Sequence, residues 1–288
     1  MQKAATGRLR KKNRTVPLAK QAGGLLVLLF YTVLVLFPLF WLVTTSFKPP
    51  LEVFSTSPLG FFRPSLENYA TVLFDDTLPR SLLNSTILSV VTVLITLPIG
   101  SLAGYVFARF PMRRKDDLFF MALTTRMAPP VAFGVPFYLL MVKFRLIDTY
   151  TGLILVYIFM NLAFCIWMTR GFFEEVPREV EEAAMVDGCS LLGSFWRVTI
   201  PLAKGGLIAT AVLMFIFAWN EFFFASILTR SEVTPFTVHL TSFFGSRRIL
   251  WGELAAASVL GSLVPITFAL LCRRYLVRGL TLGAVKGE

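Results

Sequence analysis

Apolar residues in this chain gather into long runs separated by shorter polar segments. Each run is about twenty residues or longer, the length that an α-helix needs to cross a hydrocarbon core of ~30 Å at a rise of ~1.5 Å per residue. The runs occupy residues 24–46, 82–108, 117–142, 152–171, 205–229 and 253–273. The pattern predicts an all-α integral membrane protein with six transmembrane helices and no separate soluble domain.

The polar segments divide the chain around these helices. We expect a basic cytoplasmic N-terminal segment at 1–23, a first transmembrane helix at 24–46, a membrane domain at 82–273 and a cytoplasmic tail at 274–288. The apolar run at 24–46 is too long for the core of a signal peptide, and no small-residue cleavage site follows it. We therefore interpret it as a retained helix.

Composition and charge agree with a membrane protein. The chain is 56% hydrophobic and 16% charged, with a mean hydropathy of +0.70. With both termini inside, nineteen Lys and Arg residues fall in cytoplasmic segments and eight in outside loops. Because basic residues are retained on the cytoplasmic side, this arrangement predicts cytoplasmic termini. The net charge of +11 then reflects topology and attraction to anionic membrane lipid, and not nucleic-acid binding.

The most distinctive polar segment, 172–204, falls between the fourth and fifth apolar runs and is predicted to be cytoplasmic. Residues 178–187 favour a helix, and Gly188 can end it in a left-handed conformation. A second short helix is predicted at about 190–198, before Pro201. The alternative is an amphipathic loop lying on lipid headgroups. The six acidic residues of the segment argue against that alternative, because the inner leaflet is itself negative.

This helix-turn-helix carries a spaced motif: Glu-Ala-Ala, three residues, Gly, and a Pro thirteen residues after the Gly. It resembles the EAA loop of the membrane permeases of binding-protein-dependent ABC importers. The matching residues are Glu182, Ala183, Ala184, Asp187, Gly188 and Pro201. In that family the loop is the coupling helix that docks on the ATPase subunit, so the resemblance implies an ATPase-coupling role for these residues.

Other segments are similar to the carbohydrate branch of this family, related to the smaller membrane subunit of the maltose-type importer. They are Asn84-Ser85, Ala108-Arg109-Phe110, Trp219-Asn220-Glu221-Phe222 and the tail at 278–287. The resemblance makes 82–273 an ABC transmembrane permease domain. It implies a bacterial or archaeal cytoplasmic membrane, a sugar or polyol substrate, a second permease subunit forming a heterodimer, two ATPase subunits and an extracytoplasmic solute-binding protein. We expect the outside loop around 231–252 to meet that binding protein.

Catalytic and cofactor motifs do not occur in the sequence. No Gly-x-x-x-x-Gly-Lys-Ser/Thr phosphate loop is present, so ATP and Mg are expected on the partner ATPase subunits. The single histidine, His239, has no second His or Cys at ligand spacing and does not predict a metal site. The sequence shows no set of nucleophile, base and acid residues that would indicate a membrane-embedded enzyme. The chain is predicted to bind no cofactor and to be no enzyme itself.

Polar residues inside the apolar runs are candidates for a substrate path, because a charge in hydrocarbon is costly unless it faces a cavity or a partner. The candidates are Arg126, Asn161, Trp219, Asn220 and Glu221. Pro129-Pro130 and Pro136 are expected to break or kink the third helix, which is tolerated where a helix lines a cavity. The alternative is that Arg126 and Glu221 form a structural ion pair or contact the partner subunit.

A stand-alone secondary transporter of small polar solutes is the competing function. Such proteins carry inverted repeats and paired discontinuous helices, and neither is evident in the sequence.

The Gly100-x-x-x-Gly104 spacing in the second run predicts close packing with another helix.

Overall fold

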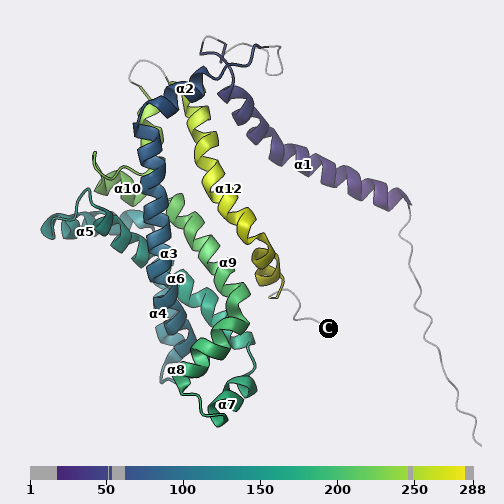
Figure 1. The fold of residues 1–288 in the computed structure, drawn as a ribbon, viewed down its shortest axis with the longest axis vertical. Coiled ribbons are helices and arrows are strands. Elements are labelled where there is room, and N and C mark those ends of the chain that lie inside the picture. Colours follow the sequence, from purple (N-terminus) through teal and green to yellow (C-terminus); the bar gives the residue numbers. More distant parts are fainter. Residues whose placement is uncertain (1–17, 51, 54–61, 246–248, 283–288) are drawn as a thin grey trace, which may run out of the picture.

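The computed structural model describes residues 18–50, 52–53, 62–245 and 249–282, and this part of the chain folds into a helical bundle with no β-strand (Figure 1). The long helices are α1 (Leu18–Ser46), α3 (Thr77–Arg109), α6 (Tyr150–Glu175), α9 (Ile200–Trp219) and α12 (Trp251–Leu282). The shorter ones are α2 (Glu67–Phe74), α4 (Lys115–Met127), α5 (Pro130–Lys143), α7 (Arg178–Val186), α8 (Leu191–Ser194), η1 (Phe195–Thr199), α10 (Phe223–Leu228), α11 (Phe236–His239) and η2 (Leu240–Phe243). The predicted all-α class is confirmed.

The core of the bundle is formed by α3, α6 and α9, with α12 packed against α9. Helices α3 and α6 approach closely at Gly100 and Gly104. A β-carbon at Gly100 would lie 2.5 Å from Cys165 Sγ, and one at Gly104 would collide with Thr169. The Thr169 hydroxyl also donates to the Gly100 carbonyl at 3.2 Å. The predicted close packing at these two glycines is confirmed.

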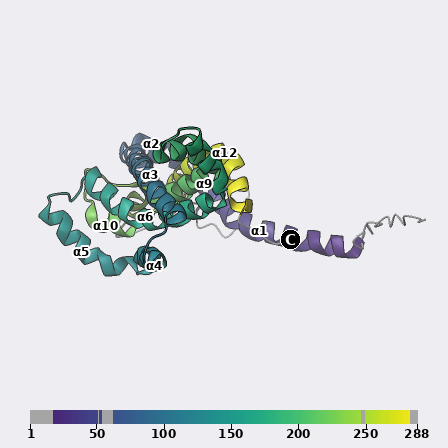
Figure 2. The same cartoon turned by 90° about the horizontal axis from the view of Figure 1, so that it is seen from below.

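Helix α1 contacts the bundle only near its C-terminal end and then diverges from it (Figures 1 and 2). The Asn68 amide donates to the carbonyls of Ser46 and Lys48 at 3.0 and 2.8 Å and so fixes the end of α1 to α2. By contrast, the apolar side chains from Leu25 to Trp41 are exposed.

Five helices in the described residues are long and apolar enough to cross a membrane, or up to six if one bent pair counts as a single span. That pair is α4 and α5, which meet at 88°. The expected break at Pro129-Pro130 is therefore confirmed. Proline forces the preceding residue into an extended conformation and lacks the N–H that would continue the helix.

The predicted fifth helix at 205–229 is wrong at both ends. Helix α9 stops at Trp219, and α10 begins only at Phe223. The Glu221 carboxylate accepts hydrogen bonds from the backbone N–H groups of Phe224 and Ala225, at 2.8 and 3.0 Å, and so starts a new helix. The described residues thus contain a helix break between α9 and α10, in addition to the break between α4 and α5.

The predicted second helix at about 190–198 is present from Leu191, but its predicted end at Pro201 is wrong. Helical structure continues from Leu191 to Trp219 through α8, the π-helical turn η1 and α9. In η1 the Ile200 N–H bonds to the Phe195 carbonyl, five residues back. The wider turn moves the preceding carbonyls away from the ring of Pro201, which would clash in a regular α-helix, so the chain continues through this proline.

Candidate functional site

A cavity of about 380 Å³ lies where the two broken helices meet α6. It is lined by Arg126 at the end of α4, Pro130 at the start of α5, Asn161 of α6, Phe217 of α9, and Asn220 and Glu221 between α9 and α10. The breaks of both helices therefore open onto the same space. Four of the five residues predicted for a substrate path meet at this cavity.

Arg126 and Glu221 line the cavity together but do not form an ion pair in the described structure. The Arg126 guanidinium donates to the Met160 carbonyl at 2.8 Å and lies 4.5 Å from the centre of the Phe217 ring. The Glu221 carboxylate accepts hydrogen bonds from two backbone N–H groups of α10. The alternative of a structural Arg126–Glu221 pair is therefore wrong, because each side chain has other partners.

The two asparagines present amide groups to the cavity in different ways. Asn161 is buried; its amide nitrogen donates to the Tyr157 carbonyl at 2.9 Å, while its Oδ1 has no partner in the described residues. Asn220 is exposed and donates to the Ile216 carbonyl at 2.8 Å. The cavity thus offers a guanidinium, a carboxylate, two amides and an aromatic ring within one small space.

Trp219, the fifth residue predicted for a substrate path, does not line this cavity. Its side chain is buried in the core, stacked between Phe215 and Phe236 at ring-centre distances of 5.9 and 6.0 Å. Successive residues of a helix point about 100° apart. The adjacent Asn220 can therefore face the cavity while Trp219 faces the core.

The EAA-like segment lies at the end of the bundle opposite α2 (Figure 1). Helix α7 ends at Val186, and Gly188 follows with φ of +91°, so the predicted left-handed stop is confirmed. Glu182, Ala183, Asp187, Gly188 and Pro201 are exposed, and Ala184 is half-buried. We call the outward apolar residues beside them the coupling face: Val186, Leu191, Leu192 and Trp196, all exposed.

The residues that fix this segment to the bundle were missed in the sequence. Glu181, one residue before the motif, is buried and accepts hydrogen bonds from Arg109 and Tyr105. Burial acts to raise the pKa of the Glu181 carboxyl, but Arg109 and Tyr105 together hold this pKa below its ordinary value. A signal was available, since Arg109 closes an apolar helix and a second acid precedes the motif glutamate.

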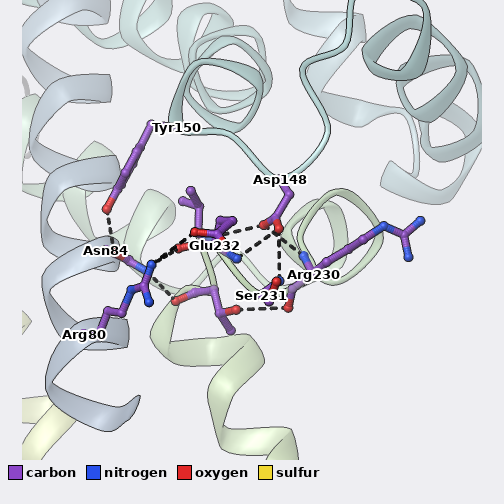
Figure 3. A network of polar contacts seen from close by, with 9 residues as sticks. Arg80, Asn84, Asp148, Tyr150, Arg230, Ser231 and Glu232 are labelled. Carbon is purple, nitrogen blue, oxygen red and sulfur yellow. Dashed lines mark hydrogen bonds and ion pairs between the residues drawn. The ribbon is translucent and has the colours of Figure 1, made fainter. Parts of the chain in front are cut away.

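At the opposite end of α3, the loop after α10 is held by Asp148 (Figure 3). The Asp148 carboxylate accepts four backbone hydrogen bonds of 2.9 to 3.1 Å from residues 230–233. Thr241 and Trp251, in the loop expected to meet a binding protein, are exposed. Arg247 and Arg248 of the same loop lie outside the described residues.

Comparison with known proteins places this architecture in a family. Residues 96–282 match the family model described as binding-protein-dependent transport system inner membrane component. The chain is 35% identical over 262 residues to the trehalose/maltose transport system permease protein MalG of Thermococcus litoralis, covering 89% of this chain and 93% of that protein. It is 34% identical to the trehalose transport system permease protein SugB of Mycobacterium tuberculosis, covering 88% and 93%.

A solved structure supports the same fold. A bacterial ABC transporter involved in the import of the acidic polysaccharide alginate superposes with a TM-score of 0.75 at 24% identity, covering 89% of this chain and 95% of that one. The match spans nearly the whole of both chains, so the likeness concerns the overall arrangement of the helices. The chain belongs to the binding-protein-dependent inner membrane components, the permease subunits of ABC importers.

Proposed function

We propose that this chain forms one half of the translocation path of a sugar or polyol importer, beside a second permease subunit. The cavity at the two helix breaks carries this proposal. A hydroxyl-rich ligand needs donors and acceptors next to an apolar or aromatic surface, and Arg126, Asn161, Asn220 and Glu221 surround Phe217 there. The relatives named for trehalose and maltose transport support a sugar as the substrate class.

The energy for transport is proposed to come from two separate ATPase subunits that bind ATP and Mg and dock on the coupling face. Exposed apolar side chains at the polar end of a membrane bundle favour a protein partner over water. Val186 and Trp196, with 87% and 50% of their surfaces exposed, would contribute apolar area to such a contact. A solute-binding protein is proposed to dock at the opposite end, beside α2.

Transport by the complete complex tests the path. The chain, its second permease, the ATPase subunits and the binding protein are reconstituted in liposomes, and uptake of radiolabelled maltose and trehalose is measured with and without internal ATP. We expect ATP-dependent uptake that falls at least tenfold in Asn161→Leu, which keeps the number and branching of the side-chain heavy atoms but removes the amide. Thr210→Val is the matched control, because this hydroxyl bonds within its own helix at 2.8 Å.

Two results would contradict the proposal. Uptake driven by an ion gradient, without ATP or any ATPase subunit, would indicate a stand-alone secondary transporter. Normal uptake by a fully assembled Asn161→Leu complex would remove the cavity from the path.

Orientation is tested separately with single cysteines in a chain whose native cysteines are replaced. Asp187→Cys is expected to resist a membrane-impermeant thiol reagent in intact cells and to react in inverted vesicles stripped of peripheral subunits. Glu232→Cys is expected to behave in the opposite way, because it lies toward the other end of α3, where it contacts Arg80. Labelling of Asp187→Cys in intact cells would place residues 172–204 outside and refute the coupling role.

A further inference from the structure

The segment that carries the coupling face is joined to the bundle by one buried ion pair. Arg109 is the last residue of α3, and Glu181 lies in the first turn of α7. The Arg109 guanidinium meets Glu181 at 2.7 Å through Nη2 and at 3.0 Å through Nε. The two side chains are only 9% and 6% exposed. A forked contact of this kind fixes direction as well as distance.

The same guanidinium also holds the end of α6. Arg109 Nη2 donates to the Val176 carbonyl at 2.7 Å. Val176 is the residue at which α6 ends, where backbone carbonyls lack helical partners. Arg109 therefore contacts both sides of the short connection between α6 and α7, and it sets the angle at which α7 leaves the bundle.

Glu181 has further partners that restrict its position. The Tyr105 hydroxyl donates to Glu181 Oε2 at 3.0 Å, one helical turn before Arg109 on α3. The Ser194 hydroxyl donates to the Glu181 carbonyl at 3.4 Å, which connects α7 to α8. The rings of Phe173 and Phe195 surround Tyr105 at 5.8 and 4.7 Å and exclude water from the contact.

The opposite side of α7 is left free. Glu182, Ala183 and Val186 are exposed, while Glu181 is the only fully buried residue of this helix. Glu181 is thus the buried charged contact of α7 with α3, and Arg178 adds a longer hydrogen bond to the Ala108 carbonyl at 3.5 Å. The motif residues project outward. An arginine–glutamate pair can impose one orientation on an otherwise exposed helix, which an apolar contact of the same size does less strictly.

We propose that Arg109 and Glu181 are positioning residues that orient α7 for the ATPase and transmit the movement of α7 to α3. This inference rests on the coupling function proposed above. It assigns the pair a role that the exposed motif residues do not have. The motif side meets the partner, and the Arg109–Glu181 side carries the displacement into the helix that forms the core with α6 and α9.

The test measures how many sugar molecules are transported per ATP hydrolysed, in the reconstituted complete complex and per assembled complex. We expect Glu181→Gln to lower this ratio at least fivefold while ATP hydrolysis without sugar persists. Arg109→Lys keeps the charge but loses the fork, and it is expected to lower the ratio by a smaller factor. Glu174→Gln is the matched control, because Glu174 pairs with Arg170 at 2.8 Å on an exposed face of α6. Its ratio should equal that of the wild type.

A pair that serves only folding would reduce the yield of complex and leave the ratio per complex unchanged, and that result would overturn the inference. If Glu181→Gln does not assemble, Tyr105→Phe removes a single hydrogen bond and keeps the ring. The inference then requires at least a twofold lower ratio in Tyr105→Phe, and a wild-type ratio would refute it. A wild-type complex with no sugar-stimulated ATP hydrolysis would instead refute the proposed function itself.

Discussion

Two carboxylates, those of Glu181 and Asp148, each fix a segment of the chain at opposite ends of α3, but their hydrogen-bond partners differ in kind. Glu181 is bound by the side chains of Arg109 and Tyr105. Asp148 is bound by four backbone N–H groups of residues 230–233 (Figure 3). Backbone donors are present whatever the side chains are, so the Asp148 contact depends on a single residue. The Glu181 contact depends on several side chains and can be broken from either partner.

The environments of the two carboxylates also differ. The Arg109–Glu181 pair is buried, so a substitution of one partner leaves the other charge without water or a counter-charge. The backbone groups around Asp148 lie in an exposed loop, where water can replace a lost acceptor. We therefore expect substitutions at the Glu181 end to cost more stability than equivalent substitutions at the Asp148 end.

The largest effect is expected from Arg109→Gln. It leaves Glu181 buried and unpaired, and the free energy of unfolding should fall by ~3–5 kcal/mol. Adding Glu181→Gln removes the orphaned charge and should restore most of that loss. Thermal unfolding of the purified chain and of both variants measures the difference. Equal destabilisation of the single and double variants would mean that volume, and not charge, sets the cost.

Asp148→Asn is expected to have the next largest effect. The amide has one acceptor oxygen in place of two, so about half of the four hydrogen bonds are lost, at a local cost of ~1–2 kcal/mol. Asp148 has φ of 57°, and asparagine adopts this left-handed conformation as readily as aspartate, so backbone strain does not contribute. Hydrogen exchange at residues 230–233 should accelerate. Unchanged protection would show that other contacts, such as Asn84 with Thr234, hold the loop.

The sequence predicts features that depend on local chemistry. The apolar runs predict the long helices, Pro129-Pro130 predicts the break between α4 and α5, and Gly188 predicts the end of α7. Each follows from covalent geometry or from the length of a run. The polar residues of the spans also identify most of the cavity lining before any fold is known, although their role in transport stays a prediction.

Features for which the local sequence allows more than one outcome, or which depend on a distant residue, are not predictable in this way. The apolar run continues through 220–229, and the break there requires Glu221 to bind the backbone of α10. Pro201 signals a helix end, yet the π turn before it lets the helix continue. The buried Glu181 looks like its exposed neighbour Glu182 in the sequence, and only its contact with Arg109, 72 residues away, distinguishes the two.

The stability of the loop held by Asp148 should depend on pH, and this dependence gives a further test of the comparison. Burial acts to raise the pKa of Asp148, but hydrogen bonds from the backbone of residues 230–233 hold this pKa below its ordinary value. Because the unfolded aspartate titrates near ~3.9, the unfolded chain binds more protons at acid pH. The stabilisation is therefore complete above that pKa and is lost as pH falls through the lower folded pKa. Hydrogen exchange at residues 230–233, compared between wild type and Asp148→Asn, should converge only at the acid end. Convergence near neutral pH would contradict this assignment.

The smallest effect is expected from Glu232→Gln. Glu232 pairs with Arg80 at 3.4 Å, with side chains 74% and 60% exposed, and exposed ion pairs contribute little. Arg80 also donates to the Glu232 carbonyl, and this contact survives the substitution. The free energy of unfolding should change by less than ~0.5 kcal/mol, whereas the same chemical change at Glu181 removes one charge of a buried pair. Both variants replace a glutamate with glutamine, and the two sites differ in burial. Comparing their thermal unfolding therefore measures how much burial adds to the loss in free energy of unfolding. A Glu232→Gln loss as large as that of Glu181→Gln would mean that exposure does not set the strength of these contacts.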